Sequence, residues 1–157
     1  APNKNIPAML ESLKGIPCLI QIVGKFNPDI KKILDENGMD YTYEWSFNIG
    51  QMYEKYKQTD ILMFASTYEG FGMPIIEAQA TGVPVITSNI SSMPEVGGEN
   101  CAIFVDPYKT SSIREAVLSL INDRPLRERL IENGFENIKR FNPEVIANMY
   151  LNLYKQI

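Results

Sequence analysis

Short apolar runs that alternate with helical segments constrain the fold of this chain more than any other feature. The runs at 18–23, 61–65, 83–87 and 102–105 are each a few residues long and are rich in Ile, Val and Leu. Such runs are typical of strands buried on both faces of a sheet, and the aromatic alternation at 41–45 indicates a further strand. Helical patterns occupy 6–13, 29–37, 49–57, 74–80, 111–121, 125–139 and 143–154. The alternation predicts an α/β fold, a Rossmann-like parallel sheet flanked by helices, with a helical C-terminal end.

Composition limits the kinds of site and of binding partner that the chain can have. The chain has 157 residues, which suits one domain, and its net charge of -4 comes with scattered Lys and Arg. No basic stripe is present, so we expect no nucleic-acid partner. There is no His, which excludes a His-dependent catalytic triad or a His-ligated zinc site within these residues. Cys18 and Cys101 lack metal-like spacing, and we expect two buried, reduced thiols in a cytoplasmic protein.

The polar segment 1–5 reads as the middle of a loop, and we interpret the chain as a piece of a longer protein. In parallel sheets, ligands bind at the carboxyl ends of the strands. Gly24, the loop 66–74 and the loop 88–95 each follow a predicted strand. We therefore expect these three segments to line one crevice.

The segment Glu69-Gly-Phe-Gly-Met-Pro-Ile-Ile-Glu77 predicts a binding site for a sugar nucleotide. Pro74 is favoured at the start of a helix, whose free N–H groups suit a phosphate. The glycines let a ligand approach the backbone closely, and the two carboxylates can accept hydrogen bonds from hydroxyl groups. Structural alternatives stay open: Glu77 could only complement the helix dipole, Glu69 could be solvated, and the glycines could only shape a turn. A hydrolase with the carboxylates as acid and base is a further alternative.

Lys4, between Asn3 and Asn5, could meet a diphosphate as a point charge or could be an ordinary surface lysine. Gly24-Lys25 is not followed by GxGxxG, and GxxxxGK[ST] is also absent, which argues against an NAD-dependent oxidoreductase and against a P-loop. No DxD pair is present to hold a metal ion on a diphosphate. We therefore expect no metal and no cofactor, with the nucleoside-diphosphate sugar as a substrate.

Two further segments have both a structural and a functional interpretation. The segment 91–95, Ser-Ser-Met-Pro-Glu, fits a helical turn with Ser caps, and its position after a strand also fits the ligand edge. An apolar stripe at helical spacing near the C-terminal end predicts core packing, or else docking on a further domain. Its members are Val145, Ile146, Met149, Tyr150 and Leu153.

With these residues in hand, the chain resembles the C-terminal, donor-binding domain of retaining glycosyltransferases of the GT-B fold, family four, "glycosyl transferases group 1". The resemblance runs from about Asn3 to the end and is most specific at 66–86, which carries the family's E-x7-E pattern. The segments 94–96 and 105–107 follow at the expected places.

The resemblance implies a role for each matching residue. Glu69 would contact the transferred sugar, Glu77 would hold the ribose hydroxyls, and Lys4 would neutralise the diphosphate. The backbone of Phe71, Gly72 and Met73 would meet the phosphates and the sugar. Gly24 would be a close-approach glycine, and the segment 46–48, with Phe47, would pack along the base.

The chain departs from the family pattern in three places. The strand and the cationic residue that the family has before the Lys4 position are missing, and so is the N-terminal acceptor domain. The family's loop at 46–48 often has a Gly where this chain has Phe47 and Asn48, which leaves base specificity open.

The resemblance implies a metal-independent transferase that moves a sugar from a nucleoside-diphosphate sugar to an acceptor hydroxyl with retention of configuration. We expect residues 1–157 to be the donor domain and to be inactive alone. Peripheral association of the parent protein with the inner membrane face is compatible with this expectation. A sugar-nucleotide epimerase and a non-catalytic nucleotide-sugar binding domain remain the alternatives.

Overall fold

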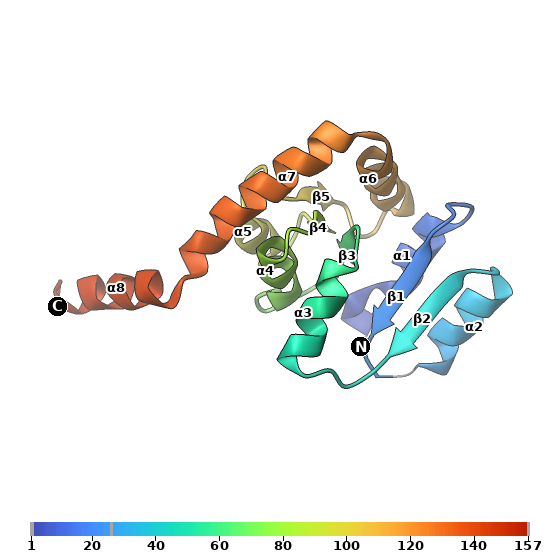
Figure 1. Ribbon diagram of the computed structural model, residues 1–157, viewed down its shortest axis with the longest axis horizontal. Helices are drawn as coiled ribbons and strands as arrows, with labels where there is room; N and C mark the ends of the chain where they lie inside the picture. The colour runs from blue at the N-terminus through green and yellow to red at the C-terminus, as the bar shows by residue number, and fades with distance from the viewer. Residues whose placement is uncertain (1, 26, 157) are drawn as a thin grey trace.

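A computed structural model describes residues 2–25 and 27–156 of the chain. Helices and strands alternate from the N-terminus to β5, and helices alone follow (Figure 1). In chain order the elements are η1 Pro2–Lys4, α1 Ile6–Leu13, β1 Leu19–Val23, α2 Pro28–Glu36, β2 Asp40–Glu44, α3 Ile49–Lys57, β3 Leu62–Phe64, α4 Met73–Ala80, β4 Val85–Ser88, α5 Met93–Gly97, β5 Ile103–Val105, α6 Thr110–Asn122, α7 Arg124–Asn137, η2 Ile138–Phe141 and α8 Pro143–Tyr154.

All strand pairs among the described residues are parallel, as the alternation predicts. Hydrogen bonds group the strands into a two-stranded sheet, β1-β2, and a three-stranded sheet in the order β3-β4-β5. Leu19 pairs with Asp40 in the first sheet, and Ile86 lies between Met63 and Ile103 in the second. Because the strands are parallel, their carboxyl ends share one edge, and the loops that follow them meet there.

Local sequence signals set the ends of several helices. The Asn27 side chain accepts from the Asp29 amide at the start of α2, and Asn48 and Gln51 form a capping box at α3. Gly38 and Gly82 follow α2 and α4 with φ of 59° and 75°, in the left-handed region that glycine adopts without strain. These caps place the helix boundaries close to the predicted ones.

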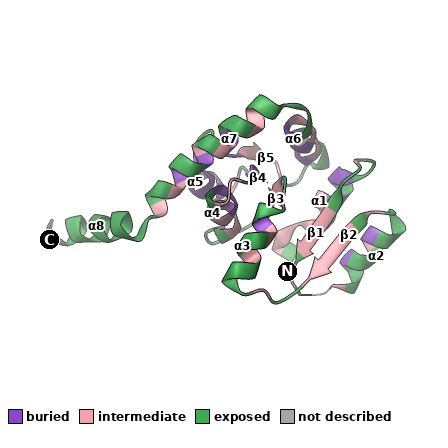
Figure 2. Ribbon diagram, in the orientation of Figure 1, coloured by how far each residue is buried: buried purple, intermediate pink, exposed green. Residues whose placement is uncertain are grey.

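The core lies between the three-stranded sheet and its helices. Residues Val85–Ser88 of β4 are all buried, and Ile86 and Ile113 have no exposed surface (Figure 2). Ile75 and Ala78 are equally buried and anchor α4 on this sheet. The helix that carries Glu77 is therefore held by its apolar face, and its amino end is left at the edge of the sheet.

Two predictions of burial near the first strand are wrong. Cys101 is buried as expected, but Cys18 is exposed. β1 was expected to be buried on both faces, yet Leu19 and Val23 at its ends are 60% and 43% exposed. Side chains alternate along a strand, so Leu19 and Val23 share one face of β1, whereas Ile20 and Ile22 on the opposite face pack on the core cluster of Leu10, Ile30 and Leu34.

The last helix leaves the body of the molecule. α8 extends away from the sheets at the C-terminal end, and all of its residues are exposed (Figures 1 and 2). Core packing of the stripe on this helix is therefore wrong: Met149 is 63% exposed and Leu153 is 54% exposed. No helix in the described part of the chain is long and apolar enough to cross a membrane.

Candidate functional site

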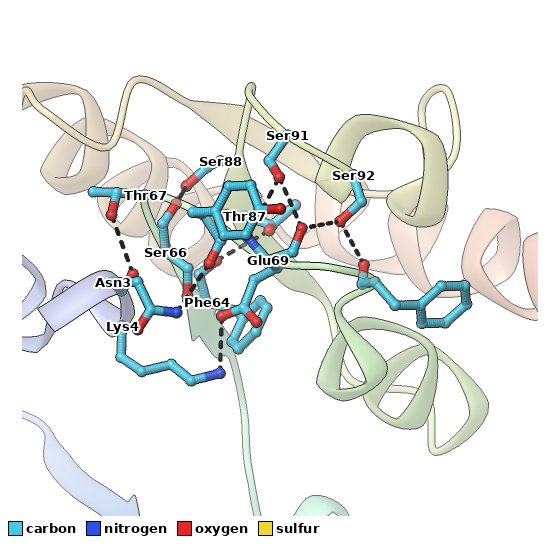
Figure 3. Close-up of polar contacts among 12 residues, drawn as sticks. Asn3, Lys4, Phe64, Ser66, Thr67, Glu69, Thr87, Ser88, Ser91 and Ser92 are labelled. Atoms are coloured by element: carbon cyan, nitrogen blue, oxygen red, sulfur yellow. Dashed lines mark hydrogen bonds and ion pairs between the residues drawn. The ribbon is translucent and has the colours of Figure 1, made fainter. Parts of the chain in front are cut away.

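The loop between β3 and α4 is held in shape by side chains from three other segments (Figure 3). Each of these side chains donates a hydrogen bond to a carbonyl group of residues 64–71. The bonds are Thr87 to Phe64 (3.0 Å), Asn5 to Ala65 (2.9 Å), Ser88 to Ser66 (2.5 Å), Asn3 to Tyr68 (3.0 Å), Ser91 and Ser92 to Glu69 (2.8 and 2.9 Å) and Ser92 to Phe71 (2.9 Å). The loop that carries Glu69 is thus fixed by hydrogen bonds along most of its length.

Lys4 and Glu69 meet at the centre of this loop although they are 65 residues apart in sequence. The η1 turn places the Lys4 Nζ atom 2.8 Å from Glu69 Oε1 and 5.1 Å from the centroid of the Phe64 ring. The Glu69 side chain is 12% exposed and that of Lys4 is 42% exposed. An ammonium group and a carboxylate therefore lie next to each other, where a charged or hydroxylated ligand can form hydrogen bonds with both.

The amino end of α4 is not capped by a side chain. Gly72 stands at the N-cap position with φ of 104°, and no side-chain hydrogen bond reaches the first turn. A Cβ atom at this position would lie 3.1 Å from Ile75 Cδ1 and would be strained by the left-handed φ, which explains the glycine. The neighbouring Phe71 and Met73 are 41% and 51% exposed. Free N–H groups at a helix start attract an anion.

Phe71 also contacts the far end of the chain. Its ring packs edge-on against the ring of Phe141, with 5.7 Å between the centroids. Phe141 is the last residue of η2, and Asn142 separates it from α8. The loop between β3 and α4 is therefore in contact with the turn that precedes the exposed helix.

Glu77 lies one turn into α4 and is paired with a tyrosine. The Tyr56 hydroxyl on α3 donates to Glu77 Oε2 at 2.9 Å. Burial, together with the charge of Glu77 and this hydrogen bond, raises the pKa of the Tyr56 phenol, which therefore stays a proton donor. No hydrogen bond or ion pair joins Glu77 to Glu69 among the described residues. A shared ligand between the two carboxylates remains a prediction.

Gly24 and Phe47 follow the strands of the other sheet. The Gly24 amide donates to the Glu44 carbonyl (2.9 Å), and a Cβ atom on Gly24 would have no neighbour within 4 Å. Phe47 is partly buried, with the Lys55 Nζ atom 5.7 Å from its ring centroid. No hydrogen bond or ion pair links either residue to Lys4 or Glu69 among residues 2–25 and 27–156. Their predicted contacts with a donor stay predictions.

Several residues of this site were not predicted as functional. Tyr56 was part of a predicted helix only, and Asn3 and Asn5 were noted only as neighbours of Lys4. The sequence signal that could have identified Asn3 and Asn5 was a side chain able to form hydrogen bonds on each side of Lys4. Ser91 and Ser92 were placed on the ligand edge, and the structure gives them hydrogen bonds to the Glu69 loop. Within the described residues, no group of three or more His, Cys, Asp and Glu could hold a metal ion.

Comparison with known proteins identifies the family. The family model "Glycosyl transferases group 1" matches residues 1–137. The chain belongs to this family. The chain is 36% identical over 168 residues to the O-antigen chain mannosyltransferase B of Escherichia coli, an alignment that covers 98% of the chain and 43% of that protein. The chain thus spans less than half the length of this relative.

Solved structures give the same assignment of the fold. A sucrose-phosphate synthase from Thermosynechococcus elongatus superposes with a TM-score of 0.88 and 25% identity, over 99% of this chain and 43% of that one. Anabaena HepE, solved in complex with UDP and glucose, gives a TM-score of 0.87 at 16% identity, over 100% of this chain and 46% of that one. The predicted fold, one Rossmann-like half of a GT-B glycosyltransferase, is confirmed.

Proposed function

We propose that this chain is the donor-binding domain of a glycosyltransferase that moves a sugar from a nucleoside-diphosphate sugar to an acceptor hydroxyl. Transfer retains the configuration of the sugar and requires no metal ion. The observation that carries the proposal is the Lys4–Glu69 pair at 2.8 Å beside the uncapped start of α4. Family membership supports it, and so does the solved complex of the similarly folded HepE with UDP and glucose.

Lys4 and the start of α4 would stabilise the departing diphosphate. When the bond from the sugar to the phosphate breaks, negative charge collects on the phosphate oxygens. The Lys4 ammonium and the positive end of the α4 dipole lie on this side of the sheet and attract that charge. These two groups provide the charge that a metal ion supplies in other enzymes. Lys4 would turn from Glu69 toward the phosphate when the donor arrives.

Glu69 would orient the sugar. Its carboxylate can accept hydrogen bonds from sugar hydroxyls and can stabilise the positive charge that develops on the ring during transfer. The fixed backbone of its loop keeps this carboxylate in place without the donor, so little reorganisation is needed at the moment of reaction.

The remaining donor contacts follow the same edge. Glu77 accepts from Tyr56 with one oxygen, which leaves its second oxygen for the ribose hydroxyls. The backbone of Phe71, Gly72 and Met73 would meet the phosphates and the sugar. In the segments after β1 and β2, Gly24 would allow the donor to approach the backbone closely, and Phe47 would pack on the nucleotide base.

The rest of the protein would supply the acceptor domain. The chain covers 43% of its E. coli relative, and its last helix exposes apolar side chains such as Met149 and Leu153. We propose that α8 packs on the additional domain and that residues 1–157 alone do not transfer sugar. Both cysteines are free thiols, which supports the proposed cytoplasmic location. Peripheral association of the whole protein with the inner membrane face belongs to the same proposal.

A melting-temperature panel with UDP-, GDP- and ADP-sugars tests donor binding. A ligand at 100 times its Kd stabilises a protein by about 2.7 kcal/mol, so binding raises the melting temperature measurably. A mannosyl donor is tested first because the 36% identical relative is a mannosyltransferase. Free sugar phosphates serve as controls. If no nucleoside-diphosphate sugar raises the melting temperature, the proposal is wrong.

A second assay tests the reaction with the full-length protein. Nucleotide release that requires an acceptor supports sugar transfer. Release or sugar interconversion without an acceptor would instead indicate an epimerase. Sugar transfer by residues 1–157 alone would contradict the proposed division into two domains.

A further inference from the structure

Asn5 occupies the N-cap position of α1, but its side chain does not cap that helix. Its Nδ2 atom instead donates to two carbonyl groups, that of Ala65 at 2.9 Å and that of Pro107 at 2.8 Å. These carbonyls follow β3 and β5 respectively. Both amide protons of Asn5 are therefore committed to the carboxyl edge of the three-stranded sheet, 60 and 102 residues further along the chain.

The backbone of Asn5 is adapted to this task. Its φ of 54° and ψ of 28° lie in the left-handed region, which Asn adopts more readily than most residues. Its amide donates to the Pro2 carbonyl at 3.1 Å and so closes the η1 turn. No other residue type combines a side chain of this length, two N–H donors on one nitrogen and tolerance of positive φ.

The anchored turn contains Lys4. On the other side of Lys4, Asn3 donates from Nδ2 to the Tyr68 carbonyl (3.0 Å), and its carbonyl accepts from the Thr67 amide (2.8 Å). The backbone of Lys4 is thus tied on both sides to the loop that carries Glu69. The lysine side chain needs only to extend from this fixed position to place its Nζ atom 2.8 Å from Glu69 Oε1.

We propose that Asn5 is a positioning residue that sets Lys4 against Glu69 and, with a donor bound, against the diphosphate. Within the described chain, the Asn5 side chain forms hydrogen bonds with the Ala65 and Pro107 carbonyls and none with the Lys4 ammonium or the Glu69 carboxylate. Its role is to fix where the lysine side chain starts. The part that concerns the diphosphate rests on the proposed function, whereas the part that concerns Glu69 does not.

Two variants separate the hydrogen bonds of Asn5 from its shape. Asn5→Gly keeps the positive φ without strain and removes the amide group. Asn5→Asp keeps the shape and replaces both donors by an acceptor that faces two carbonyl oxygens. The matched control is Asn27→Gly, because Asn27 is also an N-cap residue and its side chain bonds, among the described residues, to its own helix at the Asp29 amide. A thermal unfolding transition is used to check that each variant is folded. If Asn5→Gly does not fold, the test of the proposal rests on Asn5→Asp.

The first measurement needs no ligand. The ammonium groups of lysines are observed by 15N NMR in the 157-residue chain, and Lys4 is assigned by its loss in Lys4→Met. We expect the shifted, ion-paired signal of Lys4 in the wild type and in Asn27→Gly. In Asn5→Gly and Asn5→Asp this signal should move to the position of free surface lysines. An unchanged Lys4 signal in either Asn5 variant would overturn the proposal.

The second measurement uses UDP, GDP and ADP as probes in calorimetric titrations. Loss of a charge-assisted contact in Lys4→Met should weaken binding about tenfold to a hundredfold. Asn5→Gly should weaken binding comparably, and the double variant should bind no more weakly than Lys4→Met alone. If the losses of nucleotide affinity in Lys4→Met and Asn5→Gly multiply in the double variant, Asn5 does not act through Lys4 and the proposal is refuted. If the wild type binds none of the three, the proposed function fails, and the NMR result still decides the role of Asn5.

Discussion

Replacement of Glu69 by Gln tests the proposed site most directly. The change removes one negative charge and keeps the size of the side chain. If this carboxylate stabilises the charge that develops on the sugar, transfer by the full-length protein should fall by about 10²–10³-fold, or about 2.7–4 kcal/mol, the usual effect of removing one preorganised group. Glu69→Ala, which also removes the hydrogen-bonding atoms, should abolish transfer.

The same change should leave the fold almost as stable as before. The Glu69 side chain is only 12% exposed, but that of Lys4 is 42% exposed, so solvent reaches the pair from the lysine side and screens it there. Pairs of this kind contribute about 0.2–1 kcal/mol, and the amide oxygen of the substituted side chain can still accept from the Lys4 Nζ atom. We therefore expect the free energy of unfolding to decrease by less than about 1 kcal/mol.

The two quantities are measured on the same protein preparations. Sugar transfer is followed in a coupled assay for nucleoside diphosphate, and the free energy of unfolding is obtained from urea titration. The matched control is Glu11→Gln, which breaks a pair with Lys14 of similar length, 2.6 Å, outside the site. Near-normal turnover in Glu69→Gln would remove the central residue of the proposed site. A loss of activity that only follows a loss of stability would do the same.

Three further changes have distinct expected results. Tyr56→Phe removes the donor to Glu77 and should raise the KM for the donor severalfold with little change in kcat. In the unfolded wild type Tyr56 ionises near its ordinary pKa of 10.0, whereas the folded residue keeps its proton. The free energy of unfolding should therefore fall as the pH rises above that value, and it should fall less in Tyr56→Phe. Equal pH profiles of the two proteins in urea titrations would contradict this reasoning. Asn137→Ala leaves the buried Gln79 amide oxygen without its 2.8 Å donor and should cost about 1–3 kcal/mol by urea titration. Asn133→Ala, which removes only a solvent-exposed hydrogen bond to the Asn100 carbonyl, should cost less than about 0.5 kcal/mol. Met149→Ser in α8 should leave the melting temperature of residues 1–157 unchanged and destabilise the full-length protein; a lower melting temperature of the short chain would show that α8 packs within it.

The sequence was sufficient for most of the secondary structure. The helices 6–13, 49–57 and 143–154 have the predicted bounds, and an asparagine stands at the N-cap position of each. The strand β3 is shorter than predicted, Leu62–Phe64 instead of 61–65, because hydrogen-bonded pairing ends before the apolar run does.

What covers an apolar face could not be predicted from periodicity. The stripe on α8 has the spacing of a core helix, yet nothing within the described chain packs over it. Cys18 failed for a similar reason: an apolar run indicates a strand, but Cys18 lies before the first residue of β1 and is not covered. Periodicity reports which residues share a face, and only the three-dimensional arrangement shows what that face meets.

The residues of the candidate site were proposed from the sequence, whereas the hydrogen bonds among them were not. Glu69 and the Ser91-Ser92 segment were placed on one edge because each follows a predicted parallel strand, whereas the role of Lys4 came from the family resemblance. Contact between Lys4 and Glu69 depends on the η1 turn and on the two asparagines around it. Those asparagines fit an ordinary N-cap or loop interpretation until the distant carbonyl groups that they bind are known.

The Ser92 hydroxyl has a single proton but lies 2.9 Å from two carbonyl oxygens, those of Glu69 and Phe71. At any instant only one of them can receive it. The Glu69 carbonyl has a substitute in Ser91, whereas the Phe71 carbonyl has none in the described chain. Rotation of one hydroxyl group thus releases the half of the loop that leads into α4 while the Glu69 carbonyl stays anchored, so that the peptide groups at the start of α4 have more freedom than those at Glu69.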